Sequence, residues 1–187
     1  FLPEGVINVV VGDRDTGRAL VEHEIPQMVS ITGSVRAGME VAGSAAKGLK
    51  KLHLELGGKA PVVIFDDANL QAACEWIAVA GYFNAGQDCT AATRVLVEAS
   101  AYEDVVALLS EQAKNVIKVG MPNEDVLVGP VNNANQLARV QGFLDRVPSH
   151  ARVTAGGSAI KRPGYFWNPT VVADLKQDDE MIQSEIF

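Results

Sequence analysis

The order of the apolar runs is the feature that most restricts how this chain can fold. Residues 6–11, "VINVVV", form an apolar run between two glycines, which predicts a strand buried on both faces. Helical patterns separate this run from predicted strands at residues 28–32 and 51–56. Strands that alternate with helices over short connections are typical of βαβ units. We therefore expect an α/β fold with a parallel sheet.

The same patterns predict the other elements. "DTGRALVEH" predicts a short helix capped by Asp15 or Thr16. After the capping residues 66–69, a helix is expected to bury Cys74 on its apolar face. The other predictions are a helix from the turn at 33–34 to about 47, a strand at 61–65, the end of the Cys74 helix near 83, a strand at 93–99, a helix at 103–117, a long loop at 120–133, a helix at 137–147 and strands at 151–157 and 168–175.

Composition excludes several classes of partner. The 187 residues are 48% hydrophobic and carry a net charge of −7, which does not attract nucleic acid or anionic membranes. No apolar run reaches the ~18 residues of a membrane span. Two cysteines make at most one disulfide, so a reducing, cytoplasmic setting is favoured. The three histidines are widely separated, and no metal site is predicted.

The segment "ITGSVRAG" joins a predicted strand to a predicted helix. It places Gly33 and Gly38 on either side of the helix start, with Ser34 able to cap the helix. A helix N-terminus exposes N–H groups and a positive dipole end to an anion such as a phosphate. The alternative is an ordinary tight turn with a serine cap, because such turns greatly outnumber nucleotide sites.

The segment "LHLELGGK" places Glu55 in an apolar strand directly before two glycines. Alternation puts His53 and Glu55 on one face of the strand and the leucines on the other. Burial would raise the pKa of such a carboxylate and make it a usable general base. The alternative is a solvent-facing pair of His53 and Glu55 on a half-exposed strand.

The segment "AGQDCTA" places Cys89 in a polar, glycine-containing break between a helix and a strand. A nucleophilic cysteine needs access and nearby backbone donors, which such a break supplies. Asp88 acts against this, because a neighbouring carboxylate disfavours the thiolate. The alternative is a small buried hydrophobe, a description that suits Cys74 better than Cys89.

Taken in order, these segments resemble the aldehyde dehydrogenase superfamily. "ITGS" resembles the family's F-T-G-S turn, "LELGGK" its glutamate motif, "GQDC" its G-Q-x-C motif and "EIF" the start of its E-I-F-G-P segment. "LPEGVINVVVG" and "PGYFWNPTV" are also similar to the family at the corresponding places. The resemblance covers essentially the whole chain.

The resemblance implies roles for the motif residues. Cys89 is the implied nucleophile that attacks the aldehyde, and its backbone N–H is half of an oxyanion hole. Glu55 is the implied base that activates water to hydrolyse the thioester. The implied cofactor is NAD, and its implied contacts are Gly33, Ser34, Gly38, Leu56, Glu185 and Phe187.

The resemblance also implies a domain organisation. Residues 1–56 correspond to the C-terminal half of a Rossmann-like NAD-binding domain. Residues 57–187 correspond to an α/β catalytic domain with a parallel-rich sheet, truncated at its C-terminal end. The family's oxyanion-hole asparagine and its oligomerisation strand fall outside this sequence. We therefore expect an inactive piece of a longer enzyme whose full-length form is a homo-oligomer that acts on a small aldehyde.

Within the family, "NAGQDCTAATR" most resembles aminoaldehyde dehydrogenases, particularly 4-aminobutyraldehyde dehydrogenases. Asp88 beside the nucleophile favours a substrate with an ammonium group. Betaine-aldehyde and succinate-semialdehyde dehydrogenases are alternatives, and the latter favours an arginine near the cysteine. An alternative of another class is a non-catalytic folding or binding unit, which the absent part of the cofactor domain motivates. A third is an inactive family member with a structural role, against which the presence of both Cys89 and Glu55 argues.

Overall fold

The structure is a computed structural model that describes residues 1–121 and 123–187. The chain divides into two compact units, Phe1–Gly57 and Gly58–Phe187, and each unit is described by itself. This boundary lies one residue from the predicted division at 56/57. The assignment of the two parts to a cofactor domain and a catalytic domain stays a prediction.

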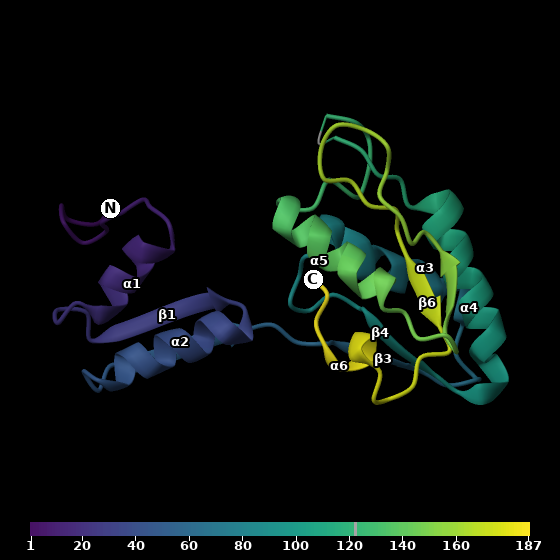
Figure 1. The fold of residues 1–187 in the computed structure, drawn as a ribbon, viewed down its shortest axis with the longest axis horizontal. Helices are drawn as coiled ribbons and strands as arrows, with labels where there is room; N and C mark the ends of the chain where they lie inside the picture. Colours follow the sequence, from purple (N-terminus) through teal and green to yellow (C-terminus); the bar gives the residue numbers. More distant parts are fainter. Residues whose placement is uncertain (122) are drawn as a thin grey trace. The chain divides into compact units, whose positions relative to one another are not determined.

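The first unit is built around one βαβ motif. Its elements are α1 (Arg14–Glu22), β1 (Met28–Gly33), α2 (Val35–Ala46) and β2 (Lys51–Leu56). The two strands are parallel and pair from Met28↔Lys51 to Gly33↔Leu56. Helix α2 lies along them (Figure 1) and contacts both. This motif confirms the predicted strand, helix, strand order.

Helix α1 begins at a different cap from the one predicted. Asp13, rather than Asp15 or Thr16, has the extended backbone of an N-cap, and its carboxylate accepts the Asp15 N–H at 2.9 Å. Asp15 and Thr16 already lie inside the first turn, so neither can take that position. At the other end, Lys50 donates from Nζ to the carbonyl of Val21 at 2.6 Å. This contact ties the end of α1 to the turn before β2.

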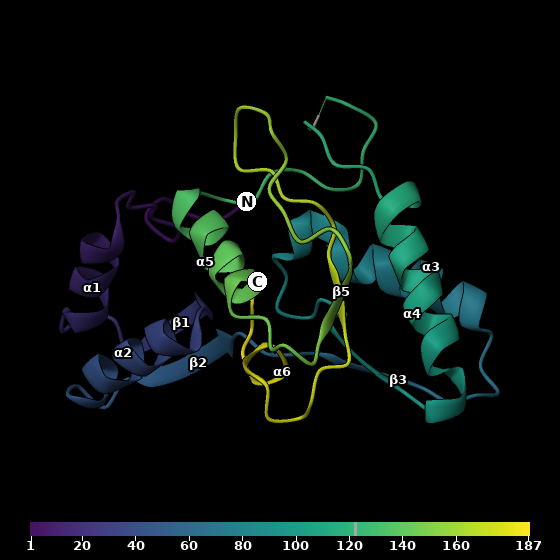
Figure 2. The same cartoon turned by 45° about the vertical axis from the view of Figure 1, so that its right-hand side comes forward.

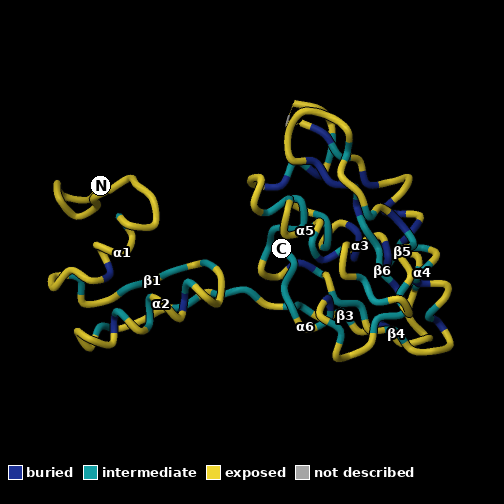
Figure 3. Tube along the Cα trace, viewed as in Figure 1, coloured by how far each residue is buried: buried dark blue, intermediate teal, exposed yellow. Residues whose placement is uncertain are grey.

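The predicted strand at residues 6–11 is wrong in this structure. The run adopts bends and irregular backbone, and its residues are exposed (Figure 3), with Val9 82% accessible. A buried parallel strand needs a neighbouring strand to complete its hydrogen-bond ladder. Among residues 1–121 and 123–187, β1 and β2 pair only with each other, so the run takes part in no ladder.

The second unit contains a second parallel βαβ motif and an antiparallel pair. The parallel pair is β3 (Pro61–Ile64) and β4 (Arg94–Val97), joined through α3 (Leu70–Tyr82). The other elements are the 3-10 turns η1 (Phe83–Gly86) and η2 (Ala99–Ala101), α4 (Tyr102–Glu111), the π-helical turn η3 (Gln112–Val116), α5 (Ala134–Asp145), β5 (Arg152–Ala155), β6 (Val171–Ala173) and α6 (Glu180–Gln183). The mixed α/β class is therefore as predicted.

The core of the second unit lies between β3, α3 and α4. Ile64, Cys74, Ile77 and Val105 form a cluster of buried side chains, and α3 and α4 lie side by side (Figure 1 and Figure 2). Cys74 is completely buried, as predicted, and burial raises the pKa of its thiol. The two helices hold the Cys74 thiol away from solvent.

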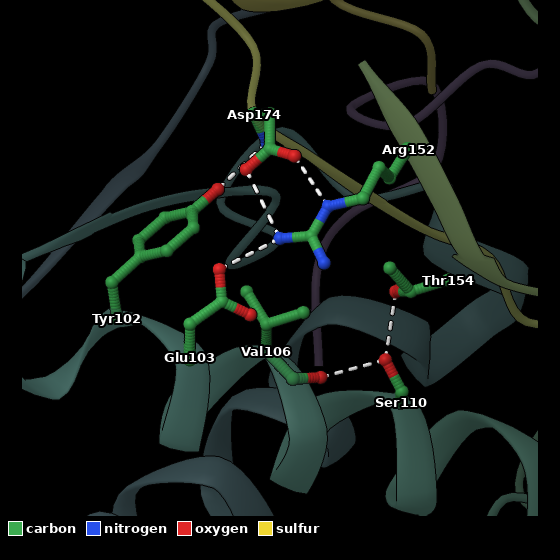
Figure 4. Close-up of polar contacts among 7 residues, drawn as sticks. All are labelled: Tyr102, Glu103, Val106, Ser110, Arg152, Thr154 and Asp174. Atoms are coloured by element: carbon green, nitrogen blue, oxygen red, sulfur yellow. Dashed lines mark hydrogen bonds and ion pairs between the residues drawn. The ribbon is translucent and has the colours of Figure 1, made fainter.

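A polar cluster holds the antiparallel pair against α4 (Figure 4). Arg152 on β5 forms ion pairs with Asp174 and, at 2.8 Å, with Glu103 of α4. These hydrogen bonds raise the pKa of Arg152 and lower that of Asp174. The Asp174 N–H also donates to the Tyr102 hydroxyl at 2.7 Å. Strands β5 and β6 are distant from α4 in sequence, and these contacts fix both strands to that helix.

The predicted loop at 120–133 joins the π-helical turn to α5. It is irregular apart from a parallel bridge between Val119 and Val128 at its start. Pro122, which belongs to the predicted loop, lies outside the described residues. Within the described parts of the chain, no helix combines the length and apolarity needed to cross a membrane.

Substitution of two glycines on α2 should have opposite effects. A Cβ at Gly38 would lie 2.6 Å from Cδ2 of Leu56, whereas a Cβ at Gly43 would meet nothing within 4 Å. Gly38→Ala should lower the free energy of unfolding by about 1–3 kcal/mol through overpacking. Gly43→Ala should raise it by about 0.5–1 kcal/mol through helix propensity. Chemical denaturation followed by circular dichroism measures both, and equal effects would contradict the close contact of α2 with β2.

Candidate active site

A constrained turn positions Cys89. Asn84, Ala85 and Gly86 have φ values of 52°, 59° and 74°, so the chain leaves α3 through three consecutive left-handed residues. A left-handed conformation costs a residue other than glycine about 1–2 kcal/mol, and such strain persists where surrounding contacts hold it in place. The turn ends at Gln87, and the Cys89 thiol that follows is free and exposed.

Gln87 fixes this turn to a distant segment. Its side-chain oxygen accepts the Asn132 N–H at 3.0 Å, and the Asn84 side chain donates to the Gln87 carbonyl at 3.0 Å. Sequence reasoning quoted Gln87 as a motif residue without assigning it a role. The contacts give it one, because they hold the backbone that leads into Cys89.

The carboxylate of Asp88 is turned back onto its own loop. Its Oδ1 accepts hydrogen bonds from the N–H and from the hydroxyl of Thr90, each at 2.7 Å. These two bonds hold the pKa of Asp88 below its usual range, so the group is negatively charged at neutral pH. The predicted effect of this charge on the Cys89 thiolate stays a prediction.

Gly58 connects the Cys89 loop with Glu185. The Gly58 N–H donates to Oε1 of Glu185 at 3.0 Å across 127 positions of sequence. A Cβ on Gly58 would lie 3.7 Å from the carbonyl oxygen of Cys89. Cys89 and Glu185, which the family resemblance assigns to one site, are thus both close to Gly58 of "LELGGK".

Two side chains of α5 hold the segment that contains Glu185. Gln136 donates to the Ile186 carbonyl at 3.0 Å, and Arg139 donates to the same oxygen at 3.1 Å and also to the carbonyl of Glu185. Phe187 also takes part, because its carbonyl accepts from Gln136. Sequence reasoning missed both donors. Their i, i+3 spacing on one helix face is the only signal that marks them.

Lys59 is a second residue that sequence reasoning missed. Burial and, to a lesser extent, the positive charge of Arg94 lower the pKa of this lysine to about 8, while the negative charge of Glu185 acts in the opposite direction. The buried Nε of Arg94 has no hydrogen-bond partner among residues 1–121 and 123–187. The charges of Arg94 and Glu185 thus both act on Lys59.

A cavity of ≈ 470 Å³ lies inside the second unit. Most of its lining is apolar and comes from α3, β4, α4 and β6, with Lys59 and Arg94 among its polar members. Cys89 and Asp88 are not part of the lining. We therefore do not assign this cavity to the aldehyde.

In the first unit, Glu55 lies at the carboxyl end of the parallel pair. The register sets Thr32 opposite Glu55 and Gly33 opposite Leu56, so the start of α2 and the end of β2 share one sheet edge. Glu55 is exposed, and its Oε1 lies 3.0 Å from Nε2 of His53. Within this unit Glu55 is not a buried carboxylate. It forms the solvent-facing pair with His53 that the sequence offered as the alternative. Glu55 and Cys89 belong to different units.

The turn at Ser34 contains the serine cap that its sequence predicted as one of two alternatives. The Ser34 hydroxyl accepts the Ala37 N–H at 3.2 Å and so caps α2. The first N–H groups of a helix have no partner within that helix, so the capped end still offers donors to an anion. One turn later, Gly38 is buried against Leu56. This close packing explains why position 38 holds a glycine. The cofactor roles of Gly33, Ser34, Gly38 and Leu56 stay predictions.

Comparison with known proteins places the chain among aldehyde dehydrogenases. A sequence model described as the aldehyde dehydrogenase family matches residues 1–187. Lactaldehyde dehydrogenase of Escherichia coli is 40% identical over 190 residues, which cover 100% of this chain and 40% of that protein. Betaine aldehyde dehydrogenase of Cereibacter sphaeroides is 37% identical over 188 residues, again covering 100% of this chain and 39% of that protein.

A solved structure agrees with these sequence matches. Aldehyde dehydrogenase C of Pseudomonas syringae, crystallised as a mutant with NAD+ and octanal, superposes with a TM-score of 0.94 at 34% identity. The superposition covers 100% of this chain and 39% of that one. The chain thus spans about two fifths of the length of the relatives it matches.

The lowered pKa of Lys59 predicts how stability changes with pH. The folded chain releases this proton near 8, whereas the ordinary value for an unfolded lysine is 10.5. Between these values the unfolded state binds more protons, so the free energy of unfolding should rise with pH. Lys59→Met removes this contribution, so the free energy of unfolding of the unaltered protein should rise relative to that of the variant from about pH 8 to about pH 10.5.

Urea denaturation across this pH range measures the gap. Lys161→Met replaces an exposed lysine of the same unit and is the matched control. The same pH dependence in both variants would contradict the burial of Lys59.

Proposed function

Because this chain belongs to the aldehyde dehydrogenase family, we propose that the protein containing it oxidises an aldehyde to a carboxylate with NAD+. The observation that carries the proposal is the exposed thiol of Cys89 on a turn fixed by Gln87 and bordered by Gly58. A constrained, accessible cysteine is what nucleophilic catalysis requires. The names of the relatives support the same reaction class.

The first step takes place at Cys89. The thiolate sulfur attacks the carbonyl carbon of the aldehyde, and the carbonyl oxygen takes up the electron pair, giving a thiohemiacetal. The backbone N–H of Cys89 is the proposed donor to this oxygen. The left-handed residues before Gln87 determine how the backbone enters the loop that carries this N–H.

The residues present fit NAD at two places. The capped N-terminus of α2 at Ser34 offers helix-end donors to a pyrophosphate without basic side chains, which suits a chain of net charge −7. The Glu185 carboxylate, held by Gly58, is the proposed acceptor for ribose hydroxyls, with Phe187 close to it in sequence. When bound, NAD+ supplies the acceptor for the hydride that leaves the thiohemiacetal carbon, and a thioester remains on Cys89.

Glu55 is the proposed base for the second step. Its carboxylate takes a proton from water while the water oxygen bonds to the thioester carbon. The carbon–sulfur bond then breaks, Cys89 leaves as the thiolate, and the acid is released. Glu55 sits at the carboxyl end of β2, the edge at which ligands of parallel sheets bind.

We propose an aminoaldehyde such as 4-aminobutyraldehyde as the substrate. The charged Asp88 lies directly before the nucleophile, and only Thr90 bonds to its Oδ1 within the described residues. A carboxylate at this position favours an aldehyde that carries a positive charge. Relatives named betaine aldehyde dehydrogenase support this preference, whereas lactaldehyde, betaine aldehyde and succinate semialdehyde are the competing substrates.

The cellular setting and assembly belong to the same proposal. The free thiols of Cys74 and Cys89 support a reducing, cytoplasmic compartment. We propose that the full-length protein is a homo-oligomer, as the family resemblance implies. Isothermal titration of the 187-residue chain with NAD+ tests the alternative of a separate folding unit, which clear micromolar binding would exclude.

Substitutions at Cys89 and Glu55 should separate the two chemical steps. In the full-length protein, Cys89→Ala should reduce aldehyde-dependent NADH formation at least ~1,000-fold, because no thiohemiacetal can form. Glu55→Gln should keep one rapid turnover of NADH and slow the steady state by about 100-fold or more, because only hydrolysis needs the base.

Stopped-flow absorbance of NADH measures both phases. Cys74→Ser is the control for loss of a thiol, and it should leave the chemistry intact provided that the variant folds. A Cys89→Ala protein that formed NADH at the unaltered rate would contradict the assignment of Cys89 as the nucleophile.

Replacing Asp88 should change the preference for charged aldehydes. Asp88→Asn should lower kcat/KM for an ammonium-bearing aldehyde by about 2- to 5-fold, the size of a partly exposed ion pair. For neutral aldehydes of the same length kcat/KM should not fall, because no electrostatic attraction is lost toward them.

Thr90→Val is the matched variant, since it removes the hydroxyl hydrogen bond to Asp88 but keeps the bond from the backbone N–H and the charge of the carboxylate. Steady-state kinetics with the ammonium-bearing aldehyde and the neutral aldehyde of the same length measures kcat/KM for both. Equal losses for the charged and the neutral aldehyde would show that Asp88 does not select substrate.

A further inference from the structure

We propose that His53 is a positioning residue that orients Glu55 for hydrolysis of the thioester, with Ser30 holding the imidazole ring. This role rests on the proposed function, because it assumes that Glu55 is the base. It adds two residues that neither the motif nor the family match assigns. The argument depends only on contacts inside the first unit.

The three side chains form a continuous polar chain across β1 and β2. The Ser30 hydroxyl lies 3.3 Å from Nδ1 of His53, and Nε2 of His53 lies 3.0 Å from Oε1 of Glu55. A neutral ring with its hydrogen on Nε2 donates to Glu55 and accepts the Ser30 O–H at Nδ1. Both ring nitrogens are therefore engaged, which fixes the ring plane.

The strand register makes this arrangement a consequence of backbone pairing. Ser30 is directly opposite His53, and Thr32 is directly opposite Glu55. Directly opposite residues of paired strands project on the same face, and residues i and i+2 share that face. Leu56 packs against Gly38 of α2, so the face that carries His53 and Glu55 points away from this helix.

The surroundings leave His53 as the neighbour best placed to orient Glu55. Lys51 is the other charged residue on this face of β2, and β1 contributes Met28, Ser30 and Thr32, none of them charged. In the described residues, no other side chain bonds to the Glu55 carboxylate.

Orientation matters because general-base catalysis depends on geometry. One oxygen of Glu55 accepts from His53, which leaves the other oxygen to take the proton of the attacking water. Glutamate has three side-chain torsions, and an unheld carboxylate samples many positions. A displacement of about 1 Å in a catalytic group can cost about 100-fold in rate. Thiohemiacetal formation and hydride loss do not use Glu55, so only the hydrolytic phase depends on His53.

The test uses stopped-flow kinetics of the full-length protein, which separate the NADH burst from the steady state. His53→Leu should keep the burst amplitude and slow the steady state by about 10- to 100-fold. His53→Gln retains an amide donor that reaches Glu55 and should restore the rate to within a few-fold of the unaltered protein. Ser30→Ala, which removes only the anchor of the ring, should give a smaller loss in the same phase.

Lys51→Met is the matched control, because Lys51 lies on the same strand face without contacting Glu55. It should leave both phases unchanged. An active protein whose His53→Leu variant hydrolyses the thioester at the unaltered rate overturns this role alone, as does an equal loss in burst and steady state. A full-length protein that forms no NADH from any aldehyde overturns both the proposed function and this role.

Discussion

The hydrogen-bond ladder between parallel strands is the constraint on which the rest of this structure depends. A parallel pair needs a crossover connection, and the helix that supplies it covers one face of the strands. In the first unit this sets the start of α2, at Ser34, beside the end of β2, at Glu55. The same pairing sets Ser30 opposite His53. The donor-rich helix end and the proposed base with its support are thus consequences of one register.

In the second unit, hydrogen bonds to distant segments hold the loop that carries the exposed Cys89. Three left-handed residues turn the chain out of α3, and Gln87 fastens the turn to Asn132. Gly58 then accommodates both the Cys89 backbone and the Glu185 carboxylate. The strain at this turn lies beside Cys89, the proposed nucleophile, and contacts from distant segments hold the turn in place.

Sequence reasoning succeeded wherever a local pattern carried the information. The periodic helices, the strands of both βαβ motifs and the burial of Cys74 follow from spacing alone. It failed at residues 6–11, because an apolar pattern predicts a buried strand without showing whether another strand pairs with it. It also missed Lys59, Arg139 and Gln136, because their roles arise from burial and from contacts between segments far apart in the chain.

By itself, the sequence determined the α/β class, the family and the two chemical groups, a cysteine and a glutamate, on which the proposed reaction depends. Periodicity and short motifs involve residues that are neighbours in sequence, so they can be recognised without knowledge of the fold. Only the tertiary structure decided three hydrogen bonds: those of Asp88 with Thr90, of Glu185 with the Gly58 N–H, and of Glu55 with His53. These contacts depend on backbone register and on hydrogen-bond geometry at a scale of 3 Å, which no linear pattern specifies.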